Sequence, residues 1–280
     1  MHIAPFENDN KPLIDVDNSI VPLTYFNIVK LGRGQAFSYQ TPGYETCVVP
    51  ATGTVDVSVE GENYSAIGLR TEDVWDGEPE GVYIPSGAKT EFICTSEVAE
   101  VFVAGAKYDK VLDPFAVRTN DIDMVQYGSD DTKTHRKIKH ILGTKYNDKV
   151  GRLLVSELFT VGAGGWSGFP SHKHDMERLP DETLHNEIYN FRFKPDHGFG
   201  MQLLQPDGDT VGNAFHLIDG STFAFNAGYH PCVAAPGYEM YYFTILGGMS
   251  QRSLIQSFQP EHAYQVETIP GIKDMIAKFK

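Results

Sequence analysis

The stretch 169-FPSHKHDMERLPDETLHNEIYNFRF-193 places two histidines one residue apart, ahead of acidic residues and an aromatic run. On a β-strand, residues i and i+2 project to the same face. His172 and His174 should therefore present two imidazoles side by side. A soluble protein has little structural use for such a pair, so the pattern favours a bound metal ion.

Two further ligands are expected from nearby strands. A turn-forming insert (residues 176–186) should return the chain as EIYNFRF (187–193), whose Glu187 can face the same interior as the histidine pair. In 220-GSTFAFNAGYHP-231, His230 follows a strand and a glycine turn. Three neutral imidazoles and one carboxylate suit a divalent transition metal: zinc, manganese, iron or nickel. The remaining candidates, His185, His197, His216 and His262, are interpreted as surface or core residues.

The rest of the chain is typical of an all-β protein. Short runs of β-branched and aromatic residues, punctuated by Gly, Pro, Asn and Asp, recur about every ten residues, which predicts a barrel or sandwich. Only the tail, residues 269–280, has the pattern of a short helix. The runs are 47–61, 81–95, 99–105, 152–161, 187–193, 198–205, 213–220, 221–228 and 240–248.

A length of 280 residues allows two compact domains or one large all-β domain. The polar, turn-rich segment 105–137 is expected to join two β-domains. We place the N-terminal barrel in residues 1–120 and the C-terminal barrel in residues 121–280. The turn Pro85-Ser-Gly87 occupies the place that Asn226-Ala-Gly228 takes later, a weak sign of internal duplication.

Composition limits the partners. A formal net charge of −14 argues against nucleic acid and anionic membrane surfaces, both of which call for a basic face. No apolar run is long enough to span a membrane, and the first residues do not resemble a signal peptide. Three cysteines at unrelated spacings favour buried thiols in the cytoplasm. The sequence leaves open whether the protein forms a homo-oligomer.

The histidine cluster resembles the two motifs of the cupin superfamily, G-x5-H-x-H-x3-4-E-x6-G and G-x5-P-x-G-x2-H-x3-N. The match departs from these motifs in three ways: Glu187 lies beyond the usual spacing, Asn226 replaces the motif proline, and one residue is missing before His230.

These departures are themselves similar to a narrower family. The stretches GGWSGFPSHKHD, NEIYNFRF, GFGMQLLQ and AGYHPCVAAPGYEMYYFTILGG resemble 5-deoxy-glucuronate isomerase of myo-inositol catabolism, most strongly over residues 153–248. The resemblance implies a tandem cupin, or bicupin, with a metal in the second barrel, and a relation to the uronate isomerase of pectin catabolism. It also implies a sugar-acid substrate.

Carried over by position, the resemblance makes His172, His174, Glu187 and His230 the expected ligands. Asn186 and Asn190 depart from the family pattern but should point away from the metal, whereas Ser171 and Thr244 depart from it closer to the site. In the first half, Thr90 stands where the motif would supply a histidine, and no H-x-H precedes residue 135. The N-terminal barrel is therefore expected to hold no metal.

The implied reaction, 5-deoxy-glucuronate to 5-dehydro-2-deoxy-gluconate, is an aldose–ketose isomerisation. A metal could bind the carbonyl and the neighbouring hydroxyl and stabilise an ene-diolate, while a side chain with a tuned pKa carries the proton. The candidates for that side chain are Tyr189, Tyr238, Glu239, Tyr241 and Tyr242, although aromatic residues on barrel strands more often serve packing. Arg252 is a candidate for holding the substrate carboxylate, whereas strand parity places Lys173 and Arg192 on a solvated outer face.

Three alternatives remain. A pectin-derived uronate is a related substrate. A cupin with this ligand set can also be an iron-dependent oxygenase, which would consume oxygen. A sugar-sensing or storage bicupin is a third interpretation, weakened because all four ligand positions are kept.

Overall fold

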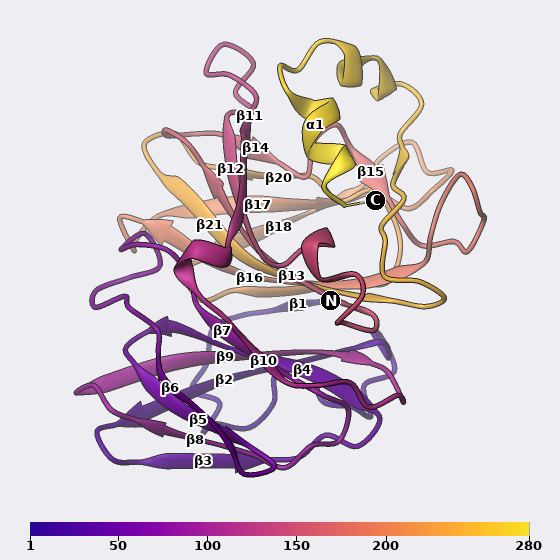
Figure 1. The fold of residues 1–280 in the computed structure, drawn as a ribbon. Helices are drawn as coiled ribbons and strands as arrows, with labels where there is room; N and C mark the ends of the chain where they lie inside the picture. Colours follow the sequence, from indigo (N-terminus) through magenta and orange to yellow (C-terminus); the bar gives the residue numbers. More distant parts are fainter. Residues whose placement is uncertain (280) are drawn as a thin grey trace.

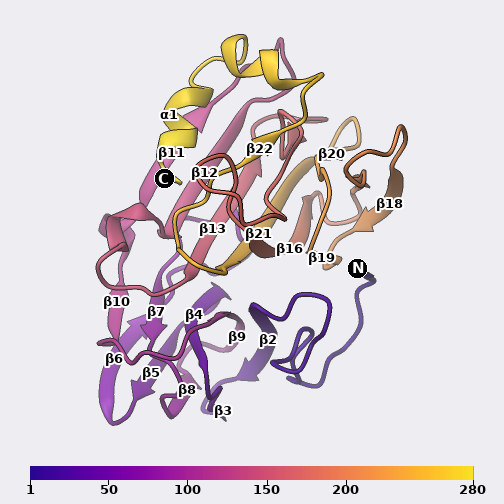
Figure 2. The ribbon, with the colours of Figure 1, turned by 90° about the vertical axis from the view of Figure 1, so that its right-hand side faces the viewer.

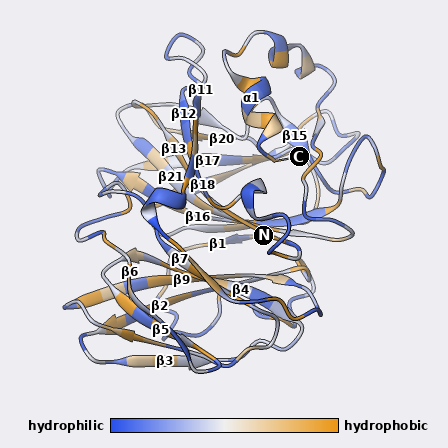
Figure 3. Ribbon diagram, viewed as in Figure 1, coloured by the Kyte–Doolittle hydropathy of each residue, from blue (hydrophilic) through white to orange (hydrophobic). Residues whose placement is uncertain are grey.

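β-Strands form most of the regular structure in residues 1–279, the part of the chain that the computed structural model describes. Figure 1 shows the N-terminal part, coloured mainly indigo to purple, beneath the C-terminal part, coloured magenta through orange to yellow. Hydrophobic residues are concentrated in the strands, and the connecting loops are mainly hydrophilic (Figure 3). Among the described residues, no helix has the length and apolar character needed to span a membrane.

The N-terminal barrel consists of two antiparallel sheets. The five-stranded sheet has the order β10-β7-β4-β9-β2, and the four-stranded sheet has the order β3-β8-β5-β6. The strand bounds are β2 (Thr24–Gly32), β3 (Ala36–Tyr39), β4 (Tyr44–Thr52), β5 (Val55–Val59), β6 (Glu62–Ile67), β7 (Gly81–Ile84), β8 (Thr90–Cys94), β9 (Val98–Lys107) and β10 (Phe115–Val117).

The C-terminal barrel has a seven-stranded sheet of order β1-β19-β16-β21-β13-β12-β11, a four-stranded sheet of order β14-β20-β17-β18, and the pair β15-β22. Its strands are β1 (His2–Ile3), β11 (Asp123–Tyr127), β12 (Arg136–Leu142), β13 (Leu153–Thr160), β14 (Trp166–Ser167), β15 (His172–Lys173), β16 (His185–Lys194), β17 (Phe199–Leu204), β18 (Asn213–Ile218), β19 (Thr222–Phe225), β20 (Cys232–Ala234), β21 (Glu239–Gly248) and β22 (Ser257–Phe258). The short helices are η1 (Thr119–Asp121), η2 (Thr144–Tyr146), η3 (Ala263–Glu267) and α1 (Ile272–Ala277).

The two barrels repeat one topology. The order β10-β7-β4-β9-β2 corresponds strand for strand to β1-β19-β16-β21-β13, and β3-β8-β5-β6 corresponds to β14-β20-β17-β18. The turns at Gly87 and Gly228 follow equivalent strands, β7 and β19, and both glycines have positive φ. The fold is therefore a tandem cupin, as predicted.

Two details differ from the expected organisation. The segment 105–137, expected to be a linker, contains the end of β9 together with β10 and β11, which complete the sheets of both barrels. The segment is so polar that it shows no alternation of apolar and polar residues, so these edge strands were not predicted. In addition, β1 pairs with β19, so the first residues belong to the C-terminal barrel's sheet. The domain boundary after residue 120 remains a proposal.

The barrels pack through their larger sheets, and strand alternation explains how. On β21, Tyr241 and Phe243 belong to the core shared with Phe26 and Phe102 of the N-terminal barrel. Tyr242, between them, belongs to the separate core inside the C-terminal barrel. One strand therefore supplies both the contact between barrels and the wall of the barrel interior.

Buried polar groups reinforce this contact. The Glu45 carboxylate accepts hydrogen bonds from the backbone N–H groups of Gly151 (2.8 Å), Arg152 (2.5 Å) and Leu153 (2.7 Å), and from the Tyr83 hydroxyl (2.6 Å). Since residues 151–153 lead into β13, this carboxylate fixes the start of a central strand of the other barrel.

We expect Glu45→Gln to lower the free energy of unfolding by about 3 kcal/mol, because an amide supplies one acceptor oxygen and a misplaced donor where four donors converge. Urea denaturation followed by tyrosine and tryptophan fluorescence measures the change. Glu91→Gln, an exposed carboxylate that accepts a bond from Ser38, is the matched control and should change stability by less than about 0.5 kcal/mol. Equal effects of the two variants would contradict this role.

Candidate metal centre

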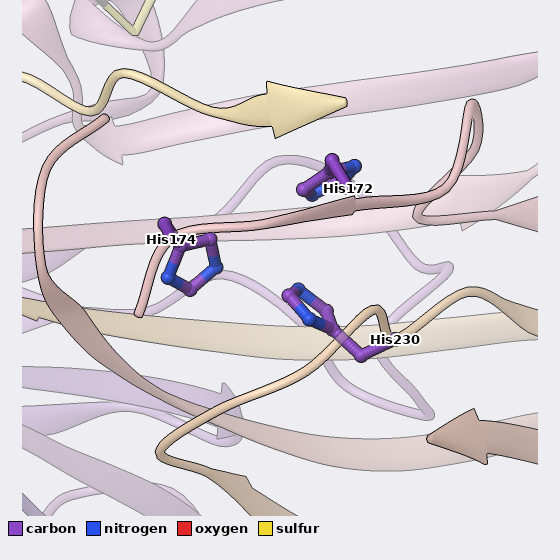
Figure 4. A group of neighbouring side chains, drawn as sticks. All are labelled: His172, His174 and His230. Atoms are coloured by element: carbon purple, nitrogen blue, oxygen red, sulfur yellow. The ribbon is translucent and has the colours of Figure 1, made fainter. Parts of the chain in front are cut away.

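Three histidines converge inside the C-terminal barrel, with their rings turned toward one another (Figure 4). His172 lies on β15, His174 directly follows that strand, and His230 lies between β19 and β20. One nitrogen from each ring lies within 4.8 Å of the others, and all three side chains are buried. The sequence placed these three residues in one site, and the structure brings them together.

The backbone holds each ring in one tautomer. Each Nδ1 lies within hydrogen-bond distance of a carbonyl oxygen, which can only accept, so each Nδ1 carries the hydrogen. The Nε2 lone pairs are then available inside the cluster, as in metal-binding histidines. The pairs are His172 with Pro170 (2.9 Å), His174 with His185 (3.1 Å) and His230 with Gly228 (2.7 Å).

Glu187, on β16, completes the cluster. Its Oε2 lies 3.1 Å from His174 Nε2 and 3.2 Å from His230 Nε2, and its Oε1 accepts a hydrogen bond of 2.9 Å from the Thr244 hydroxyl. His230 Nε2 is buried and has no hydrogen-bond partner despite that short distance. A buried imidazole nitrogen without a partner, facing a carboxylate and two more imidazoles, fits a metal ion.

The electrostatics of the cluster favour the same interpretation. Burial, followed by the neighbouring His230 and His174, lowers the pKa of His172 to about 3, so its ring is neutral at pH 7. Burial opposes ionisation of Glu187, but its close contacts with the His174 and His230 rings hold the pKa of this carboxyl well below its usual range. An ionised carboxylate beside neutral imidazole is the protonation state that a transition metal requires.

A cavity next to the cluster is lined by His172 and Glu187 at one side and by aromatic and aliphatic side chains elsewhere. Tyr189 and Tyr242, two predicted catalytic residues, both line it, and their ring centroids are 4.2 Å apart. The Tyr242 hydroxyl is 2.6 Å from Ser167 Oγ. Burial raises the pKa of both tyrosines well above the usual value, so both phenols are neutral at pH 7.

The other catalytic candidates lie elsewhere. Tyr238 packs against His197 and Phe199, outside the residues that line the cavity. Tyr241 faces the contact between the barrels and donates to Glu157. Glu239 accepts from the backbone of Gly162 at a partly exposed position. Tyr238 lies in the turn before β21, so the structure does not bring it to the cavity, and its catalytic role stays a prediction.

Arg252 is also outside the cavity. Its guanidinium donates to the backbone carbonyls of Leu153 (2.7 Å), Leu142 (2.5 Å) and Gly143 (2.9 Å), and to the Asn147 side chain. These bonds tie the chain after β21 to the turn after β12. Its donors are engaged in supporting loops, so the structure gives no support to its expected role in holding a substrate carboxylate, which stays a prediction.

Lys173 and Arg192 were expected on a solvated outer face, and this expectation was wrong, because both side chains are covered and form ion pairs. Lys173 is buried and forms ion pairs with Asp175 (2.6 Å) and Glu182 (3.2 Å), because the insert after the histidine pair folds back over it. Arg192 forms an ion pair with Glu100 of the N-terminal barrel at 2.7 Å. The outer face of this sheet is the contact between barrels.

Two polar residues of the cavity were missed. Gln256 Nε2 lies 3.0 Å from His172 Nε2, and Arg136 lines the cavity from the start of β12. The C-terminal segment that carries Gln256 also brings Leu254, Phe258 and Met275 to the cavity, and Figure 2 shows α1 beside β11 and β12. No local pattern marks Gln256. Alternation of Arg136 with Ile138 in RKIKHIL could have placed Arg136 inside.

In the N-terminal barrel, Thr90 opens β8, and its hydroxyl donates to the Ala88 carbonyl at 3.3 Å. Within residues 1–279, the group of His, Cys, Asp and Glu side chains placed to hold a metal ion is the histidine trio of the other barrel. That the N-terminal barrel holds no metal stays a prediction.

The duplicated barrels and the buried histidine cluster define the chain as a bicupin with a candidate metal centre in its second barrel. Among solved structures, it is similar to an IolB-like protein from Salmonella typhimurium LT2, with a TM-score of 0.79 and 23% identity over 86% of this chain and 89% of that one. It is also similar in fold to an oxalate decarboxylase of Lactobacillus farciminis, with a TM-score of 0.60 and 8% identity over 92% and 87% of the two chains.

Sequence comparison gives the family. The KduI/IolB family model matches residues 2–265, and the chain belongs to that family. Its relatives include the 5-deoxy-glucuronate isomerase of Geobacillus kaustophilus (strain HTA426), 29% identical over 87% of this chain and 86% of the relative. The 5-deoxy-glucuronate isomerase of Bacillus subtilis (strain 168) is 28% identical over 93% and 94%.

Proposed function

We propose that this protein is a metal-dependent isomerase that converts 5-deoxy-D-glucuronate to 5-dehydro-2-deoxy-D-gluconate in myo-inositol catabolism. Family membership over residues 2–265 and relatives of that name along most of the chain support the reaction. The observation that carries the metal is the buried cluster in which three Nδ1–H groups donate to carbonyls, while the Nε2 atoms of His174 and His230 face Glu187.

His172, His174, Glu187 and His230 are the residues that would hold the ion. A divalent transition metal, such as zinc, manganese, iron or nickel, would supply a Lewis acid that polarises the substrate carbonyl and its neighbouring hydroxyl. The Thr244 hydroxyl orients Glu187 through its bond to Oε1. The aromatic and aliphatic lining of the cavity excludes water from the reacting carbons.

Isomerisation requires a proton to leave carbon 2 and return to carbon 1. Tyr189 and Tyr242 are the catalytic residues that we retain, because both phenols line the cavity that also reaches His172 and Glu187. With their pKa values raised by burial, both are neutral hydrogen-bond donors that can protonate or orient the substrate oxygens. Ser167 extends this set, since its hydroxyl is bonded to that of Tyr242.

We also infer a cytoplasmic location. Cys47, Cys94 and Cys232 are all buried and free, which suits a reducing compartment and the sugar-acid metabolism proposed here.

The test is a substrate screen of the purified protein whose metal content has been determined by elemental analysis. We expect 5-deoxy-glucuronate to give the ketose product, identified by NMR, with a specificity constant at least about 100-fold above that for a pectin-derived 5-keto-4-deoxyuronate. Oxygen uptake, measured in parallel with the iron-loaded protein, should be absent. Metal-loaded protein that leaves 5-deoxy-glucuronate unchanged would overturn the assignment, and oxygen uptake would support the oxygenase alternative.

A further inference from the structure

Arg136, the first residue of β12, places a guanidinium in the wall of the cavity that also contains His172 and Glu187. The residue is 2% exposed. Its guanidinium carbon lies 4.6 Å from the centroid of the Tyr127 ring, on the neighbouring strand β11. Packing on an aromatic face fixes the plane of the guanidinium.

The hydrogen bonds of Arg136 leave much of its capacity unused. One Nη donates to Ser167 Oγ at 3.2 Å, and the other donates to the Phe169 carbonyl at 2.6 Å. The Nε–H is buried and has no partner. A guanidinium has five N–H groups in a planar fork, so some of its donors have no acceptor among the described residues of the protein.

The positive charge of Arg136 is also uncompensated. Within residues 1–279, no Asp or Glu oxygen lies within 4.0 Å of an Arg136 nitrogen, the distance that defines an ion pair. Arg70, equally buried, shows the usual arrangement: it forms an ion pair with Glu157 at 2.6 Å. A buried charge without an opposite charge is costly, and such an arrangement suits a site that is completed by an anionic ligand.

We propose that Arg136 binds the carboxylate of the substrate and thereby selects sugar acids over neutral sugars. This inference rests on the proposed function for the identity of the substrate. The substrate would bind with its carboxylate at Arg136 and its aldehyde end toward His172 and Glu187. The other cations considered from sequence, Lys173, Arg192 and Arg252, are engaged elsewhere.

The same contact connects carboxylate binding to the tyrosine that we retain as catalytic. Ser167 Oγ lies between Arg136 (3.2 Å) and the Tyr242 hydroxyl (2.6 Å). A carboxylate seated on Arg136 would therefore position the sugar relative to Tyr242. A neutral sugar of the same size would leave the buried guanidinium unpaired, and a site of this kind rejects such analogues by large factors.

The test compares two variants, Arg136→Gln and Arg136→Lys, with the control Arg192→Gln. Arg192 forms an ion pair with Glu100 outside the cavity. For 5-deoxy-glucuronate, Arg136→Gln should raise KM by about 100-fold with less than a tenfold change in kcat, because the carboxylate is bound in both ground and transition states. Arg136→Lys should recover part of the loss, and Arg192→Gln should match the parent protein.

A binding measurement separates this inference from the proposed reaction. Calorimetric titration with D-glucuronate and with D-glucose should show a preference for the uronate that Arg136→Gln abolishes and Arg192→Gln keeps. Retention of that preference in folded Arg136→Gln would overturn the inference, even if the isomerase activity is established. Its loss in Arg136→Gln would support the inference, even if 5-deoxy-glucuronate proves not to be the substrate. Arg136→Lys serves as the folded comparison should Arg136→Gln be unstable by circular dichroism.

Discussion

His172→Ala and His230→Ala should each reduce the metal content of the purified protein to less than about a tenth and the turnover of 5-deoxy-glucuronate by about 1000-fold. Each substitution removes one of the four proposed ligands. Within residues 1–279, no further His, Cys, Asp or Glu side chain is grouped with the three histidines to take its place. Loss of His230 also removes a contact of 3.2 Å with Glu187 Oε2, so the carboxylate would be left with His174 as its imidazole partner. Elemental analysis and steady-state kinetics measure the two effects.

His197→Ala provides the control, because that side chain is exposed on a loop after β16 and should leave both metal content and turnover unchanged. Circular dichroism should show the same β-rich spectrum for all three variants, since the hydrophobic core of the barrel does not depend on either imidazole. Full metal content in both His172→Ala and His230→Ala would show that the ion, if present, is held by other residues.

Strand periodicity predicted the parts of the site that lie on long strands. On β16, Tyr189 and Phe191 belong to the barrel core on the side of Glu187, whereas Asn186 and Asn190 face away and bond to Leu23 and Thr222. The two-residue repeat is reliable there because ten consecutive residues pair with β21. The recurring strands of both halves predicted a β-barrel or sandwich, and the family resemblance predicted the tandem cupin.

The same rule failed where the chain leaves regular strands. Lys173 has outward parity, but β15 contains two residues, and the following insert covers the side chain with Asp175 and Glu182. Arg136 and Gln256 reach the cavity from the start of β12 and from the C-terminal segment, each more than 30 residues from the histidine pair. Tertiary contacts of that range have no local signature in a single sequence.

Removal of the metal with a chelator should abolish turnover of 5-deoxy-glucuronate and leave the fold intact, with restoration when a divalent metal is added back. The barrels have hydrophobic cores of their own, unlike small domains that depend on a structural metal. In the metal-free protein, burial disfavours a protonated His174, but contact with the Glu187 carboxylate outweighs it and raises the pKa of His174. That pairing offsets part of the cost of the buried carboxylate. Circular dichroism should therefore change little, and full turnover by verified metal-free protein would overturn the mechanism.

The path of the proton gives the complementary measurement on the metal-loaded protein. A base that meets solvent between the two transfers exchanges the proton taken from carbon 2 before it returns a proton to carbon 1. Product formed in deuterated water should then carry deuterium at the hydroxymethyl carbon that was the aldehyde carbon of the substrate, detected by NMR, as expected for proton transfer by side chains of the cavity. The control is product incubated with enzyme from which the metal has been removed, which should acquire no label at that position. Turnover without solvent label would instead favour a shielded base or a hydride shift between the carbons, and the buried, largely apolar cavity around Tyr189 and Tyr242 would then be the structural reason for the shielding.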